Sequence, residues 1–327
     1  MHHTKKILKA AALACLLGPL ALPAMAAQGY PDKPITMLVP YPAGQSVDLL
    51  ARVISDGLSK VLGQPIIVEN KPGAGGTLGT GLVARAAPDG YTLGMSSSGP
   101  LGIAPHLFKN TNYDPVKDFT AIMDVAAVAQ TMVVSAKSDI KSVQDLVAAA
   151  KAQPNKLNFG SPGNGSTSHL TQEMFKQRAH VQMLHVPYKG GPAAITDLIG
   201  GQIDVLFEAS PTVTPFINRG DLRALAVTTR TSIPALPQVK PLASQGYENF
   251  EAVGWMGIIG PAHMKPEIVQ KLHAALVKTL QDPAVREKLD TQGMLTVGDT
   301  PQQFAAFIKS ESEKWGEVIR NADIKVQ

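Results

Sequence analysis

The chain has little cysteine, few aromatic residues and modest charge, and these shortages narrow its class. Cys15 is the single cysteine in 327 residues, aromatic residues make up 5% and charged residues 17%. No low-complexity tract, charge block or repeat of 20–50 residues is present, which argues against a disordered tail, a repeat scaffold or an adhesion protein. With 44% hydrophobic residues, the chain is expected to build an ordinary packed core.

Long hydrophobic runs are also lacking, apart from one near the N-terminus. Residues 1–26 read as a secretory signal peptide: three lysines precede an apolar stretch over 10–22, and Ala24-Met25-Ala26 supplies a small-x-small cleavage site. A lipoprotein interpretation around Cys15 is weaker, because the apolar run before it would be very short. Cleavage after Ala26 would leave a chain without cysteine, so disulfide bonds and thiol chemistry are excluded.

The positive charge of the chain lies mostly in this leader. The formal charge is +4, and three of those charges belong to the lysines of residues 1–26, so the remainder is near +1. Nucleic acid is therefore not an expected partner. The remaining length of about 300 residues favours two domains over one.

Motifs for cofactor chemistry are incomplete throughout. The glycine-rich run 73–79 follows a strand, but the next strand ends in serines instead of the acid that would hold a ribose. The run 160–167 resembles a P-loop, yet Ser166 stands where the phosphate-binding lysine must be. The histidines show no metal spacing, and 94–99 misses the G-x-S-x-G pattern by one residue. We therefore expect no cofactor and no metal, and an enzyme acting on a small carboxylated substrate is kept as the alternative.

Strand and helix patterns alternate along the chain, which predicts an α/β fold of mainly parallel sheets covered by helices. Apolar β-rich runs occupy 35–41, 65–70, 91–97, 157–160, 183–188, 203–207 and 222–228. Amphipathic segments occupy 50–62, 142–153, 166–180, 192–201, 266–280 and 301–322. Two unusually long extended stretches, 119–136 and 250–261, are interpreted as crossings between two lobes. The predicted domains are 27–125 plus 252–327 for lobe 1 and 126–251 for lobe 2, with a ligand cleft at the carboxyl ends of the strands.

Two matching glycine-rich loops, each placed between a strand and a helix, carry the functional hypothesis. The first is Y-P-A-G-Q-S-V-D at 41–48, and the second is G-S-P-G-N-G-S-T at 160–167. A helix N-terminus has unpaired N–H groups and a partial positive charge, and glycine allows an anion to approach the backbone closely. Two such loops predict a small anion clamped between two lobes.

In its sequence blocks the chain resembles the Bug-type periplasmic solute-binding proteins of the tripartite tricarboxylate transporter family (TctC-like). The blocks are Y-P-D-K-P-I at 30–35, V-E-N-K-P-G-A-G-G at 68–76, A-P-D-G-Y-T-L at 87–93, G-N-G-S at 163–166, H-V-P-Y-K-G-G at 185–191, L-R-A-L-A-V-T at 222–228 and Trp315-Gly316. The resemblance covers nearly the whole chain after the leader. It implies a two-lobed Venus-flytrap fold, capture of a small di-, tri- or aromatic carboxylate, and delivery to an inner-membrane permease. It also implies a monomeric, non-enzymatic transport protein of the periplasm.

The candidate ligand-binding residues come from the two loops and from neighbouring strand ends. They are Tyr41, Ala43, Gly44, Gln45, Ser46, Ser96, Ser97, Gly160, Gly163, Asn164, Gly165, Ser166, Thr167, Tyr188 and Glu208.

The first loop departs from the family pattern at two positions. Gln45 replaces a glycine, so it either donates to the ligand or fills space, and Val47 replaces a hydroxyl residue. Some side chains near the loops can have a structural role instead of binding the ligand. Asp48 is expected to brace its helix, His169 to be a satisfied helix histidine, and Glu208 either to pair with a ligand amine or to bind loop amides.

Overall fold

The computed structural model describes residues 29–324. The described residues from Pro31 onward form one compact unit. The predicted signal peptide lies outside the described residues. Within the described part, no helix combines the length and the apolar character that a membrane crossing requires.

Two sheets make up the unit, and each contains three parallel strands. In the first sheet, β1 (Ile35–Val39) pairs in parallel with β2 (Ile66–Asn70) and with β3 (Thr92–Ser97). In the second, β5 (Asn158–Ser161) pairs in parallel with β6 (Leu184–Pro187) and with β7 (Val205–Ala209). The predicted two-lobed α/β fold is confirmed, with the strands that join the sheets running antiparallel to their neighbours.

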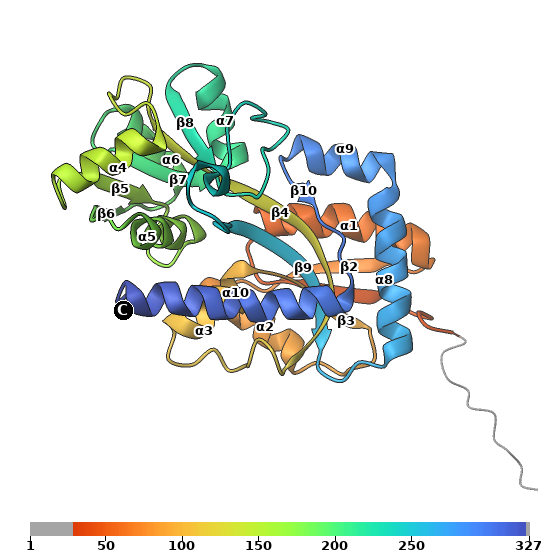
Figure 1. The fold of residues 1–327 in the computed structure, drawn as a ribbon. Coiled ribbons are helices and arrows are strands. Elements are labelled where there is room, and N and C mark those ends of the chain that lie inside the picture. The colour runs from red at the N-terminus through yellow and green to blue at the C-terminus, as the bar shows by residue number, and fades with distance from the viewer. Residues whose placement is uncertain (1–28, 325–327) are drawn as a thin grey trace, which may run out of the picture. The chain divides into compact units, whose positions relative to one another are not determined.

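Strand β4 (Phe119–Ser135) belongs to both sheets. Its first part pairs with β9 (Val253–Pro261) as far as Ala129, and from Gln130 onward it pairs with β7. Its last residues also pair with β8 (Leu222–Val227). Figure 1 shows β4 and β9 running side by side from one group of strands toward the other. These are the two long stretches that the sequence analysis interprets as crossings.

Helices flank both sheets, and their ends follow from local chemistry. The longer ones are α1 (Ser46–Leu62), α4 (Val143–Ala152), α5 (Thr167–Ala179), α8 (Pro266–Gln281) and α10 (Pro301–Asn321). Helix α1 ends where predicted, because Gly63 adopts the left-handed conformation (φ 71°) that stops a helix. The shorter α6 (Gly191–Ile199) also lies close to its predicted segment, and α2 (Thr77–Ala84) begins within the glycine-rich run 73–79.

Several short elements were not predicted. They are η1 (Ala74–Gly76), η2 (Gly99–Ile103), α3 (Ala104–Leu107), α7 (Ser210–Asn218), η3 (Leu242–Gln245), α9 (Pro283–Thr291) and β10 (Leu295–Thr296). Helix α7 contains Pro215 in its interior, where proline removes a backbone hydrogen bond and normally argues against a helix. Tertiary packing of Val213 against the second sheet supports α7 in spite of this.

Helix α10 contributes to the cores on both sides. Phe304 and Ile308 pack in the core cluster of the first sheet with Trp255. Toward the C-terminal end of the same helix, Trp315 and Val318 pack in the main core cluster of the second sheet. The C-terminal helix therefore spans the two halves, as its course in Figure 1 also shows.

A buried carboxyl group lies on β4 where the strand passes under α10. Asp124 is 3% exposed and its Oδ1 has no hydrogen-bond partner. Burial, with the nearby carboxylates of Asp299 and Glu311, raises the pKa of Asp124 well above its ordinary value. A raised pKa means that this group favours the folded state at low pH, and that its contribution is lost as the pH rises through the folded-state pKa.

Asp124→Asn is therefore expected to stabilise the protein at pH 8 by about 1–3 kcal/mol, the usual cost of a buried group left without compensation. The gain should vanish near pH 4, where the aspartate is protonated in the folded state. Urea unfolding at several pH values measures it, with the exposed Asp56→Asn on α1 as a control. A gain independent of pH would contradict the electrostatic reason.

Candidate functional site

A cavity of about 480 Å³ lies at the carboxyl ends of strands from both sheets. Tyr41 follows β1, Ser97 ends β3, the loop at 162–166 follows β5, and Ala209 ends β7. The residues predicted for the site that line this cavity are Tyr41, Ser46, Ser97, Gly163, Asn164, Gly165, Ser166 and Thr167. Ligands of open α/β sheets bind at such strand ends.

The first wall is the loop that leads into α1, and Asp48 braces it. Asp48 accepts hydrogen bonds from the Gly44 amide (2.8 Å), Asn70 Nδ2 (2.8 Å) and Arg52 Nε (3.0 Å). Burial alone would raise the pKa of Asp48, but the hydrogen bonds from Arg52, Gly44 and Asn70 outweigh it and lower that pKa. The bracing role predicted for Asp48 is confirmed.

The hydrogen bond from Gly44 to Asp48 determines which backbone amides of the first wall are free to donate to an anion. The Gly44 N–H is already committed to Asp48, so the first-turn amides of α1, beginning at Ser46, are the donors that remain. Beside them Tyr41 Oη lies 2.9 Å from Ser97 Oγ, which places two hydroxyl groups together on the cavity wall.

The second wall is the loop that leads into α5, and its own atoms hold it in shape. Ser166 caps the helix by accepting from the His169 amide at 3.2 Å, and its Oγ donates to the Gly163 carbonyl at 2.8 Å. The Gly165 N–H donates to His169 Nδ1 at 3.1 Å. The amides at the start of α5, from Thr167, are therefore the ones left to meet an anion.

Two histidines behind the second loop are held neutral. His169 stacks on His185 with ring centroids 3.8 Å apart, and His185 stacks on Phe159 at 4.7 Å. Burial, with the charges of its neighbours His185 and Lys176, lowers the pKa of His169 to about 3. Burial and Lys176 lower the pKa of His185 to about 4. His169 is thus uncharged at neutral pH, and its 3.9 Å approach to Glu173 is no ion pair there.

The histidine stack predicts a loss of stability on acidification. A histidine in the unfolded chain takes up a proton near pH 6.5, whereas the folded-state pKa of His169 is about 3. The contribution of His169 is therefore present above pH 6.5 and is lost as the pH falls toward its folded-state pKa. Between pH 7 and pH 5 the expected loss is about 2 kcal/mol for His169, and His185 adds to it.

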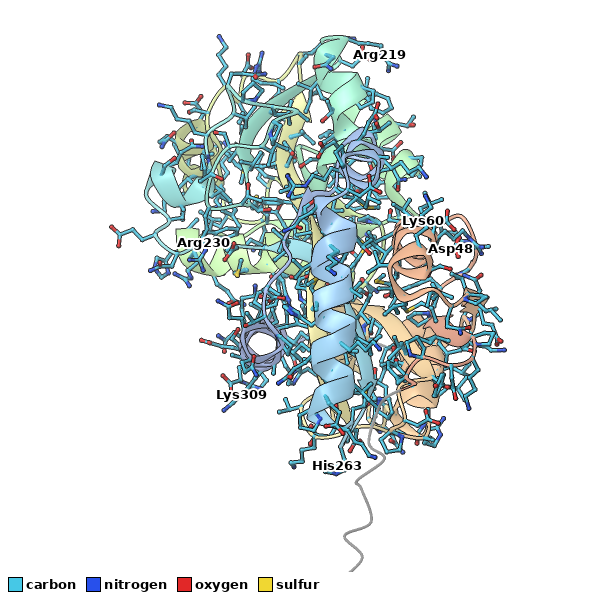
Figure 2. All side chains as sticks on the ribbon, turned by 90° about the vertical axis from the view of Figure 1, so that its right-hand side faces the viewer. Asp48, Lys60, Arg219, Arg230, His263 and Lys309 are labelled. Carbon is cyan, nitrogen blue, oxygen red and sulfur yellow. The ribbon has the colours of Figure 1, made fainter. Side chains whose placement is uncertain are left out.

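His169→Asn should flatten this dependence, because asparagine does not titrate and its carbonyl can still accept from the Gly165 amide. Urea unfolding at pH 7, 6 and 5 compares the variant with the parent. His263→Asn is the matched control, because His263 is exposed and points away from the body of the protein in Figure 2. An unchanged slope in His169→Asn would show that other groups dominate the pH dependence.

The floor of the cavity comes from the crossing strands and was not predicted. Val128 and Gln130 on β4, and residues 254–256 on β9, line it. Gln130 Oε1 accepts from Ser168 Oγ at 3.1 Å, which orients its amide. Trp255 Nε1 donates to Glu311 on α10 at 3.2 Å, and the same oxygen accepts from Trp315 Nε1 at 3.0 Å. Glu311 thereby fixes the fully buried indole of Trp255, a residue of the floor strand β9.

A helical segment after β3 supplies a further wall that sequence reasoning missed. Ile103, Ala104, Leu107 and Phe108 line the cavity, together with Ser98 and Gly99. Phe108 lies beside Gly75, a position that also lines the cavity. The prolines and glycines in this stretch concealed its helical character, so only the serines at the end of β3 signalled a nearby site.

Other predicted residues lie off the cavity lining. Gly44 and Gln45 are exposed at the entry to α1, as is Ala43. Ser96 is buried and lies 3.3 Å from Thr80 Oγ1, and Gly160 packs against Ile203 in the core. Tyr188 donates to Asp197 at 2.8 Å. Their role as ligand contacts therefore remains a prediction.

Glu208 also lies off the cavity lining, behind Ala209. Its Oε1 accepts from the Ala209 amide at 2.8 Å, while Oε2 lies against Gly191 without a partner. Burial raises the pKa of Glu208. Of its two proposed roles, binding to a loop amide is the one for which the structure has a hydrogen bond.

Within residues 29–324, the cavity lining carries backbone amides and hydroxyl groups but no cationic side chain. Lysine, arginine and histidine are absent from its lining among residues 29–324, and Lys60, Arg219, Arg230 and Lys309 project outward in Figure 2. The same stretch holds no group of three His, Cys, Asp or Glu side chains placed to bind a metal ion. Helix N-termini and hydroxyl groups are thus the electropositive features that face the cavity.

Comparison with known proteins places these features in a family. Residues 50–324 match the model described as the tripartite tricarboxylate transporter family receptor. Protein BugT of Bordetella pertussis is 36% identical over 304 residues, covering 93% of this chain and 93% of BugT.

Two solved structures are similar and hold carboxylates. An R. palustris protein solved with adipate is 30% identical with a TM-score of 0.75, covering 90% of this chain and 99% of that one. MatC from Rhodopseudomonas palustris, with bound malate, is 30% identical with a TM-score of 0.72, covering 89% of this chain and 100% of that one.

Proposed function

Because this chain belongs to the tripartite tricarboxylate transporter receptor family, we propose that it is an extracytoplasmic solute-binding receptor for a small carboxylate. The carboxylate binds in the cavity that Ser46 and Thr167 line from opposite loops. The receptor acts in the periplasm, after removal of residues 1–26, and delivers its ligand as a monomer to the membrane subunits of a tripartite tricarboxylate transporter.

The observation that carries this proposal is that two helices begin at one cavity, whose lining in the described part of the chain has no cationic side chain. Helices α1 and α5 begin at the cavity, and each directs first-turn N–H groups and a partial positive charge toward an anion. Such groups suit a carboxylate, which accepts several hydrogen bonds at once. The adipate and malate held by the two related structures support the same ligand class.

A ligand that contacts both helix starts favours closure of the two lobes. The proposed lobes are 27–125 plus 252–327 and 126–251, and the change of β4 from β9 to β7 near Ala129 supports a hinge there. Thr228 links the two crossing strands at this point, since its Oγ1 accepts from the Gln130 amide at 3.0 Å and donates to the Ala252 carbonyl at 2.5 Å. A ligand with more contacts in the closed form shifts the population toward it.

A binding screen of the secreted protein tests the proposal. Malate, adipate, benzoate and glutamate are titrated by calorimetry and in thermal melts, each beside the amide in which its carboxylate is neutralised. We expect at least one carboxylate to bind with one-to-one stoichiometry, to raise the melting temperature and to be recovered unchanged. Scattering should also show a smaller radius of gyration at saturation.

The screen also separates the rival function. Conversion of a bound carboxylate into a product would favour a secreted enzyme. Equal binding of acid and amide would contradict an anion site at the helix starts.

A further inference from the structure

Resting on the proposed function, we propose that the ligand of this chain carries one carboxylate on an apolar, uncharged body. The donors for an anion are the starts of α1 and α5 and the hydroxyls beside them. Apart from the amides of Gln130 and Asn164, much of the remaining lining is apolar, and it includes Ile103, Leu107, Phe108, Val128 and Met256. One charged group of a ligand has partners here, and the remainder of the ligand meets apolar surface.

Phe108 is the side chain that indicates this most directly. It is 36% exposed at the cavity wall, although most large apolar side chains of the protein are buried. An apolar ligand body lying on Phe108 would remove its ring from water, which is favourable. A charged group in the same place would lose hydration without gaining a partner.

The floor makes the same case. Trp255 on β9 is fully buried and its indole N–H is committed to Glu311, so this side chain gives the cavity no free donor. Gln130 and Asn164 place neutral amides in the lining, and a neutral amide is a weaker partner for a carboxylate than a cation is. A second carboxylate would find no lysine, arginine or histidine in the lining within residues 29–324.

The volume of the cavity is large enough for an apolar group attached to the carboxylate. A cavity of about 480 Å³ lies within the range of roughly 300–1,000 Å³ that small-molecule sites occupy. A six-carbon chain or a phenyl ring with a short linker fits this range, so hexanoate and 3-phenylpropanoate are suitable probes.

The deciding experiment uses ligands of matched length that differ in one terminal group. Hexanoate and adipate share six carbons, and butanoate and succinate share four, but the second member of each pair has an additional carboxylate. Calorimetry with the secreted protein should give hexanoate an affinity at least tenfold higher than that of adipate, and 3-phenylpropanoate an affinity higher than that of malate. Adipate or malate binding as tightly as the monocarboxylates, or more tightly, would overturn the proposal.

Variants at Phe108 test the apolar wall itself. Phe108→Ala should lower the affinity for hexanoate and for 3-phenylpropanoate by about fivefold or more. The affinity for acetate should change by less than about twofold, because acetate has no apolar chain that could lie on the Phe108 ring. Leu184→Ala is the control, since Leu184 is exposed on β6 and lies outside the lining. Equal weakening of acetate and hexanoate by Phe108→Ala would count against a body-binding wall.

A lysine introduced at position 108 should reverse the preference for hexanoate over adipate. Phe108→Lys should raise the affinity for adipate relative to hexanoate by at least tenfold, while Phe108→Gln should not. An unchanged ratio in Phe108→Lys would show that the ligand body does not reach this wall, and would overturn the assignment. Failure of every carboxylate to bind the parent protein would instead reject the proposed function, so the two failures are distinguishable.

Discussion

Replacing Thr167 with aspartate is expected to weaken carboxylate binding by about a hundredfold or more while the fold survives. Thr167 is the first residue of α5 and lines the cavity. A carboxylate there is favourable for the helix, by about 0.3–1 kcal/mol, because it meets the positive end of the dipole. The same charge repels an anionic ligand by about 4 kcal/mol at 4 Å with an effective dielectric of about 20, which exceeds two decades of affinity.

The two readouts move in opposite directions, which makes the test specific. Calorimetry should show the loss of affinity, and thermal melts without ligand should show an unchanged or higher melting temperature. Thr167→Asn is the matched control, because it has a similar size and no charge. Equal losses in the aspartate and asparagine variants would point to shape instead of charge, and a Thr167→Asp variant that binds normally would place the anion elsewhere.

Gly79→Ala is expected to destabilise the protein by about 3 kcal/mol, the upper part of the usual range for overpacking. A Cβ added at Gly79 would lie 2.5 Å from the Lys71 carbonyl oxygen and 2.8 Å from Pro40 Cα. Both are backbone atoms at the ends of β2 and β1, so neither can rotate away as a side chain would. Helix α2 would have to move away from the sheet that it covers.

The control for this change is Gly200→Ala at the end of α6. Its φ of −74° suits any residue, and the nearest atom to an added Cβ is the Thr196 oxygen at 3.4 Å, an ordinary contact. Urea unfolding should place this control within about 0.5 kcal/mol of the parent. A loss for Gly79→Ala no larger than that of the control would mean that α2 yields easily.

Much of this architecture is readable from local patterns. The amphipathic pattern of α1 and the alternation of strands and helices depend on neighbours in sequence. Asp48 was also placed correctly, because an acid in the first turn of a helix has an obvious partner in the loop before it.

The cavity itself depends on contacts that sequence patterns do not contain. Val128 and Trp255 are far apart in the chain, and they meet on the floor because β4 and β9 pair. The amides of Gly44 and Gly165 seemed suited to an anion, yet Asp48 and His169 occupy them. Those partners follow from side-chain directions, which the presence of a glycine alone does not specify.

The shared strand β4 also sets an order for assembly of the native chain. Its first half must pair with β9, whose residues follow more than a hundred positions later, whereas β5 to β8 follow it directly. Local pairings close sooner than distant ones. The second sheet is therefore able to form while β3 still presents a bare edge, and until residues 253–261 arrive that edge is open to pairing with another chain. We therefore expect the return of β9 to the first sheet to be the slowest and most aggregation-prone stage of folding.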